Sequence, residues 1–162
     1  MRSAKILFLV LVATVSQGCG PQAEKTVVAD ESLETGKVLV RGYMEQLING
    51  HEWDAWDEYY NEILVFNGHE MSRHDMRTMA ETFGGILEGF RVEIEEQIAE
   101  GDTVATRVTF HGTHTGDYMG LKASGKTLTF GGLALDRIEE GKIVESWHQM
   151  DIWGTLLMAS DD

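Results

Sequence analysis

The chain has 162 residues, of which 43% are hydrophobic and 25% charged, a composition that is typical of a folded domain and excludes a disordered or collagen-like chain. Acidic residues outnumber basic ones 27 to 13, and the formal charge of -14 argues against nucleic acid as a partner. The only cysteine is Cys19, which excludes an intramolecular disulfide and a cysteine-based zinc site.

The N-terminus is typical of an export signal. Arg2 and Lys5 precede an apolar run over residues 6–15, which small and polar residues follow. This run is too short to cross a bilayer. We therefore expect residues 1–18 to be a cleaved signal peptide.

The end of this segment resembles a bacterial lipobox, in which the residue after the cleavage point is a lipid-modified cysteine. Gly18 and Cys19 carry the resemblance. We expect residues 19–30 to be the lipidated cysteine and a polar tether, and residues 31–162 to form one domain. The protein is then anchored at the cell envelope, on its periplasmic or extracellular face, with the N-terminal lipid as its only membrane contact. A soluble secreted protein with a free N-terminal thiol is the alternative.

Helical spacing dominates the first half of the domain. Apolar residues recur every three to four positions from Ser32 to Asn49, which predicts an amphipathic helix. The run from Ile63 to Phe66 is short and rich in β-forming residues, so it predicts a strand. A further helix is expected to begin at Ser72, which has capping-box spacing with Asp75, and to end at Gly84-Gly85. Between the first helix and the strand, a second short helix is expected to carry an aromatic stripe of Trp53, Trp56, Tyr59 and Tyr60.

Beyond Gly89 the hydrophobic period changes to two, which predicts strands joined by glycine-containing turns. Three helices followed by an antiparallel sheet predict an α+β domain. A closing helical turn is expected over residues 153–159. The predicted strands are Phe90–Ala99, Thr103–His114, Thr127–Ile138 and Lys142–Ile152.

Residues Gly120 to Thr127 match the phosphate-binding loop pattern of a glycine, four residues, then Gly-Lys-Thr. That loop works only when a helix follows it and directs its amide groups at the phosphates. Here the sequence after Lys126 alternates like a strand, so we expect no nucleotide site.

The six histidines do not predict a metal site. His111 and His114 are three positions apart on one predicted strand, so their side chains leave from opposite faces. The same geometry separates His148 from Asp151. No metal is expected.

Asp151 is the carboxylate that we single out as a catalytic candidate. Burial beside Trp147 would disfavour its charged form, which is how a carboxylate becomes a general acid or base near neutral pH. The alternative is that Asp151 caps the closing turn, and spacing alone favours the cap. Strict alternation on the last strand places on one face Ile143, Glu145, Trp147, Gln149 and Asp151, and on the other Val144, Ser146, His148 and Met150.

Several blocks together resemble the SnoaL-like polyketide (ester) cyclase family. They are Gly112 to Gly120 with its Gly-Thr-His-Thr-Gly core, Ser124 to Lys126, Arg137 to Trp147, and Asp151. The resemblance implies a nuclear-transport-factor-2-like fold, a cone in which three N-terminal helices close over a curved antiparallel sheet and leave an internal pocket. Such folds are usually dimers that pack through their sheets, so a homodimer is expected.

The resemblance also implies a chemistry. In the family's cyclases, the aspartate that matches Asp151 transfers a proton during ring closure of a polyketide, without metal or cofactor. By resemblance, His114, Trp147, Gln149 and Asn67 line the pocket, and Arg137 stands where characterised cyclases place a histidine. The expected function is a cyclase or isomerase that acts on a small hydrophobic carbonyl compound. The alternative is a non-catalytic, lipid-anchored binding protein for hydrophobic small molecules in the cell envelope.

Overall fold

The computed structural model describes residues 22–160, with side chains from 31 to 159. The expected signal peptide, Cys19 and the next two residues therefore lie outside the described residues. Across the described range, no helix has both the length and the apolar character needed to cross a bilayer.

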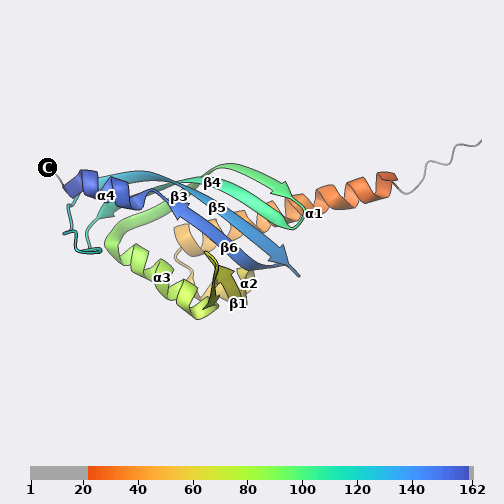
Figure 1. Ribbon diagram of the computed structural model, residues 1–162, viewed down its shortest axis with the longest axis horizontal. Coiled ribbons are helices and arrows are strands. Elements are labelled where there is room, and N and C mark those ends of the chain that lie inside the picture. Colours follow the sequence, from red (N-terminus) through yellow and green to blue (C-terminus); the bar gives the residue numbers. More distant parts are fainter. Residues whose placement is uncertain (1–21, 161–162) are drawn as a thin grey trace, which may run out of the picture.

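The described chain opens with a long helix, α1 (Gln22–Tyr43), which continues into a π-helical turn, η1 (Met44–Asn49). The predicted end at Asn49 is confirmed. The start precedes Ser32, so the part of the expected tether from residue 22 onward is helical, as its Gln, Ala, Glu and Lys residues favour. Figure 1 shows the first half of α1 projecting beyond the sheet. The second half packs against the sheet at Gly36, where an added Cβ would lie 3.1 Å from the Val104 side chain.

Two short helical turns and a hairpin follow. The turns are η2 (Trp53–Ala55) and α2 (Trp56–Tyr59), and the hairpin consists of β1 (Tyr60–Phe66) and β2 (His69–Ser72). Asn67 and Gly68 form the turn of the hairpin with φ angles of 48° and 81°, the left-handed values that a tight hairpin turn requires. Tyr60 was expected in the second short helix but begins β1, and β2 was not predicted.

Helix α3 (Arg73–Ile86) begins where it was predicted. The Ser72 hydroxyl accepts a hydrogen bond from the Asp75 backbone N–H at 3.1 Å, so the expected N-cap is confirmed. The expected end at Gly84-Gly85 is wrong by one residue. The helix continues to Ile86, whose side chain is buried in the core.

Four long strands complete a six-stranded curved sheet in the order β2-β1-β6-β5-β4-β3 (Figure 1). The predicted strands are confirmed with small shifts at their ends. The expectation of a wholly antiparallel sheet is wrong for one pair, because β1 runs parallel to β6. The long strands are β3 (Leu87–Glu100), β4 (Thr103–His114), β5 (Thr127–Glu139) and β6 (Lys142–Met150).

A last helix, α4 (Ile152–Ser160), packs against β5 where a closing helical turn was expected over residues 153–159. The described chain thus has four α-helices, one more than the three N-terminal helices of the expected cone. Helices α1, α2 and α3 cover one face of the sheet (Figure 1). One hydrophobic cluster fills the space between these helices and the sheet, and a second fills the end closed by α4. The result is an α+β fold whose interior lies under the helices.

Candidate functional site

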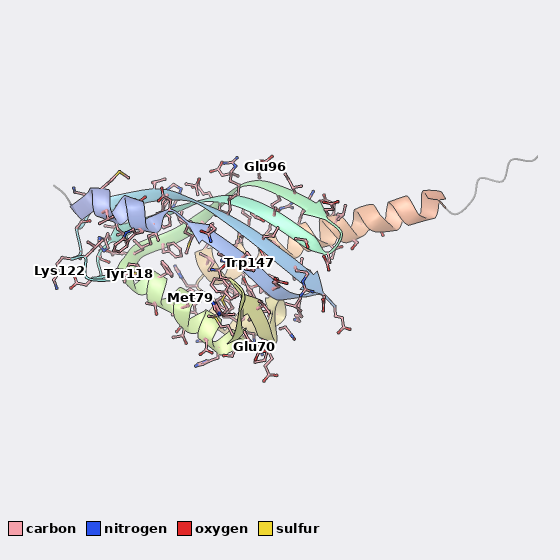
Figure 2. The ribbon with its side chains drawn as sticks, viewed as in Figure 1. Glu70, Met79, Glu96, Tyr118, Lys122 and Trp147 are labelled. Atoms are coloured by element: carbon pink, nitrogen blue, oxygen red, sulfur yellow. The ribbon has the colours of Figure 1, made fainter. Side chains whose placement is uncertain are left out.

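A cavity of about 300 Å³ lies between α1, α3 and the inner face of the sheet. This volume is at the lower end of the range for small-molecule pockets and has room for about ten water molecules. Most of its wall is apolar, with phenylalanine and methionine side chains from several elements. Figure 2 labels two lining residues, Met79 on α3 and Tyr118 on the loop between β4 and β5.

A buried polar cluster lies behind the cavity wall on two neighbouring strands. Asp136 on β5 pairs with Ser146 on β6 in the sheet register, and both are completely buried. The Ser146 hydroxyl donates to Asp136 Oδ1 at 2.5 Å. His148, two residues further along β6, lines the cavity and places Nε2 3.7 Å from the same carboxylate oxygen. A buried carboxylate therefore stands directly behind a histidine of the cavity wall.

Two tyrosines lie near this carboxylate. Tyr43 on α1 and Tyr60 on β1 are buried with their rings edge to face, 5.4 Å apart. Burial, and then the negative charge of Asp136, raise the pKa of both phenols well above the ordinary tyrosine value. Both side chains are therefore neutral hydrogen-bond donors at neutral pH.

Asn67 fixes the position of His148. Its Oδ1 accepts from the His148 backbone N–H at 2.8 Å, and its Nδ2 donates to the His148 carbonyl at 3.3 Å. The neighbouring Phe66 ring packs edge-on against the imidazole, with centroids 5.2 Å apart. The backbone and the ring of His148 are thus both held from the β1–β2 turn.

Four buried polar atoms of this region make no hydrogen bond of normal geometry within the described part of the chain. Such atoms are rare in folded proteins and call for an explanation at each occurrence. The Tyr43 hydroxyl lies near Tyr60 and Asp136 without bonding to either in good geometry. The four atoms are Tyr43 Oη, Trp56 Nε1, Asp136 Oδ2 and His148 Nε2.

Of the six site residues that the sequence analysis named, the cavity lining includes Asn67 alone. The expectation that Asp151 is buried is wrong, because its side chain is exposed. It directly precedes α4, and its Oδ1 would lie 2.8 Å from a Cβ added at Gly154, so it folds over the first turn of that helix. This position matches the alternative role of a helix cap.

Trp147, Gln149 and Arg137 lie on the outer face of the sheet, away from the cavity. Trp147, labelled in Figure 2, is 45% exposed. Its indole N–H donates to Glu145 at 2.9 Å, and Arg137 donates to the other oxygen of the same carboxylate at 3.0 Å. These two bonds lower the pKa of Glu145. Gln149 is exposed beside Asp151.

His114 is buried, but it lies outside the cavity lining and anchors the loop between β4 and β5. Its Nδ1 accepts from the Ser124 backbone N–H at 3.3 Å. Its own backbone N–H and carbonyl bond to Lys126 and Gly125. The loop held in this way carries Tyr118, which packs against Phe83 over the cavity.

A β-bulge explains why alternation failed on β6. Arg137 pairs with Glu145 while Ile138 pairs with Ile143, so Val144 is an extra residue in this strand. Ile143 is therefore completely buried, on the same side as Ser146 and His148, instead of sharing a face with Trp147. Asp136 and His148 were not predicted as site residues, although each is a polar residue on a strand whose neighbouring inward positions are buried, which was the available signal.

A model of the SnoaL-like polyketide cyclase family matches residues 38–157, most of the chain. The chain belongs to the SnoaL-like polyketide cyclase family. No curated protein matches this sequence significantly.

Several solved structures share the fold. A SnoaL-like polyketide cyclase from Agrobacterium tumefaciens is 20% identical, with a TM-score of 0.67 over 73% of this chain and 92% of its own. TsrD from Streptomyces laurentii is 22% identical, with a TM-score of 0.68 over 76% and 95%. IdmH from Streptomyces antibioticus is 21% identical, with a TM-score of 0.68 over 76% and 96%. At these identities the likeness establishes the fold.

Two further features of this SnoaL-like chain bear on its chemistry. The segment that matches the phosphate-loop pattern leads directly into β5 at Thr127, so the required helix does not follow it. Across residues 22–160, no group of three or more histidine, cysteine or carboxylate side chains could hold a metal ion. The polar side chains that line the cavity include the His148 imidazole and the phenols of Tyr43 and Tyr60.

Proposed function

We propose that this SnoaL-like domain binds a small hydrophobic carbonyl compound in its internal cavity and transfers a proton on it, with His148 as the general acid and base. The observation that carries the proposal is the position of the imidazole. It lines a mostly apolar cavity, with a completely buried carboxylate 3.7 Å behind Nε2.

The chemistry follows from the pairing. An imidazole can accept and donate a proton near neutral pH. A carboxylate beside Nε2 favours the tautomer with its proton on that atom, which leaves the Nδ1 lone pair to act as the base. The carboxylate also stabilises the imidazolium that forms after proton transfer. The 3.7 Å separation is long for a hydrogen bond, and such contacts commonly tighten in the complex with substrate.

Asp151 is less suited to this role than the sequence implied. Its exposed side chain at the start of α4 meets bulk water instead of an enclosed substrate. The variants His148→Gln and Asp151→Asn therefore separate the two assignments. Asn67 bonds to the backbone of residue 148, so the glutamine variant keeps the contacts that position the strand.

The test needs no knowledge of the natural substrate. A base in the cavity should exchange the α-protons of a bound methyl ketone for deuterium, and 2-acetylnaphthalene in D2O, followed by NMR, reports this exchange. We expect the wild-type protein to accelerate exchange and His148→Gln to lower the rate about 100-fold or more. Asp136→Asn should lower it as well, and Asp151→Asn should leave it unchanged.

An unchanged exchange rate in His148→Gln would refute the proposed base. Loss of exchange in Asp151→Asn would restore the aspartate assignment. The apolar lining of the cavity supports a second candidate, a binding protein without chemistry. Tight binding of the ketone without any exchange above the rate in buffer would select that candidate.

A further inference from the structure

Trp56 has a donor that the protein leaves without a partner. The residue follows η2 as the first residue of α2, is 4% exposed and lines the cavity. Its ring packs against Tyr60 with centroids 5.0 Å apart, which fixes the plane of the indole. The Nε1 atom is buried and makes no hydrogen bond with any described residue.

The indole N–H is a donor only, so an acceptor must come from elsewhere. Buried tryptophan nitrogens usually find a partner, and an unsatisfied buried donor is unfavourable. Asn67, which also lines the cavity, has its side-chain oxygen engaged by the His148 backbone. A ligand in the cavity can supply the missing acceptor, because the Trp56 ring is part of the wall.

The charge of the wall restricts that acceptor further. The described residues that line the cavity include neither lysine nor arginine. The completely buried carboxylate of Asp136 stands close behind His148. A negatively charged ligand would lose its hydration and meet this carboxylate at short range with only the imidazole to offset it. A neutral oxygen acceptor fits both conditions.

We propose that Trp56 is the specificity-determining residue of the cavity, and that it selects a neutral ligand whose carbonyl oxygen accepts its indole N–H. This inference rests on the proposed function, because it assigns the ligand class of the same cavity. Trp56 is the group that recognises the ligand's oxygen, whereas His148 is the group that transfers the proton.

Three probes of nearly equal shape test the proposal. 2-Acetylnaphthalene carries a carbonyl oxygen, 2-isopropenylnaphthalene has a CH2 group in its place, and 2-naphthoate is the corresponding anion. Binding is measured by calorimetry at neutral pH. We expect the ketone to bind roughly tenfold more tightly than the hydrocarbon, because only the ketone satisfies the indole. We expect the naphthoate to bind more weakly than the ketone.

The chain has four tryptophans, so its indole N–H groups give few signals in a proton–nitrogen NMR spectrum. The ketone should move the Trp56 signal downfield, and the hydrocarbon should not produce this downfield shift. Trp147 and Trp153 are exposed and serve as internal references. Because this measurement uses the wild-type protein, it does not depend on a variant that folds.

The variant Trp56→Phe identifies the signal and removes the donor while it keeps an aromatic ring. We expect it to bind the ketone and the hydrocarbon equally. Trp53→Phe is the matched control, because Trp53 is half-buried, packs beside His51 and lies outside the cavity lining. This control should retain the preference for the ketone.

Each outcome bears on one proposal in particular. The role of Trp56 is overturned if the ketone and the hydrocarbon bind to the wild-type protein with equal affinity, or if the Trp56 NMR signal does not shift when the ketone binds. Either result leaves the proposal that the cavity binds small hydrophobic molecules intact. If none of the three probes binds, the proposed binding of small hydrophobic ligands in the cavity is refuted and both proposals fail. If the ketone preference is found but His148→Gln exchanges protons normally, only the proposed base fails.

Discussion

Asp136 acts on two neighbouring phenols of the cavity lining, Tyr43 and Tyr60. Burial and its negative charge raise the pKa of Tyr43 and Tyr60 in the folded protein, so the folded state holds both protons more tightly than the unfolded state. An unfolded tyrosine ionises near pH 10. Above that pH the unfolded state binds fewer protons, and the free energy of unfolding must fall as pH rises.

This linkage gives a prediction for Tyr43→Phe. In the wild-type protein the free energy of unfolding should fall by up to about 1.4 kcal/mol per pH unit for each phenol above about pH 10, until the folded-state pKa is reached. The variant has only one of the two phenols with a raised pKa, so its free energy of unfolding should fall less steeply as pH rises. Urea unfolding between about pH 9 and about pH 11 measures the slopes. Parallel curves for the two proteins would contradict the pKa shift of Tyr43.

The candidate site was only partly predictable from sequence, and His148 shows why. The alternation of β6 separated His148 from Trp147 and Asp151 correctly, but it gave no indication of which face is inward. Trp147 suggested the wrong face, since a tryptophan is usually taken as a core residue and this one is 45% exposed. The pairing of Asp136 with Ser146 depends on register between strands, which the local pattern does not contain.

At the scale of elements, α3 forms one wall of the cavity, and its first turn depends on Ser72. The helix places Met76 in the core and Met79 against the cavity. Its cap satisfies one of the backbone N–H groups that every helix leaves unpaired at its start.

Replacement of Ser72 by alanine should lower the free energy of unfolding by about 1 kcal/mol, because the hydrogen bond to the Asp75 N–H is lost. Ser72→Asn is the matched control, since asparagine is an equally good cap, adds no charge beside the Asp75 carboxylate and should retain most of the stability. The midpoint and slope of urea unfolding provide the measurement. Equal midpoints for the alanine variant and the wild-type protein would show that the cap contributes nothing.

The elements themselves were predicted where the signal is local. Spacing identified α1 and α3, and the glycine-containing turns identified the long strands. Strand β2 was missed although Asn67-Gly68 is a recognisable two-residue hairpin turn. The parallel pairing of β1 with β6 joins segments about 80 positions apart, and no local pattern encodes it.

At the scale of the whole molecule, the outer face of the sheet carries an exposed apolar group of Leu133, Leu135 and Trp147. The first two lie on β5, and Leu135 pairs with Trp147 on β6. A partly apolar sheet face can pair with a second copy of itself about a two-fold axis. We therefore expect a homodimer that packs through this face.

Leu135→Glu should shift the protein toward monomer, as measured by light scattering on a sizing column. Val38→Glu is the control, since Val38 is also an exposed aliphatic residue but lies on α1, away from the sheet face. Each chain carries a formal charge of -14, so salt should strengthen the dimer by screening repulsion. A wild-type protein that is monomeric at high concentration and high salt would refute the expectation.

The cavity wall takes residues from Tyr43 on α1 to Met150 at the end of β6. Its binding surface comes into existence only after the last strand has docked beside the first one. A ligand of this cavity therefore binds the folded protein and not the unfolded chain. Increasing concentrations of the ligand should raise the melting temperature. Such a ligand is also a probe of correct folding, because a truncated or partly folded chain lacks the binding cavity.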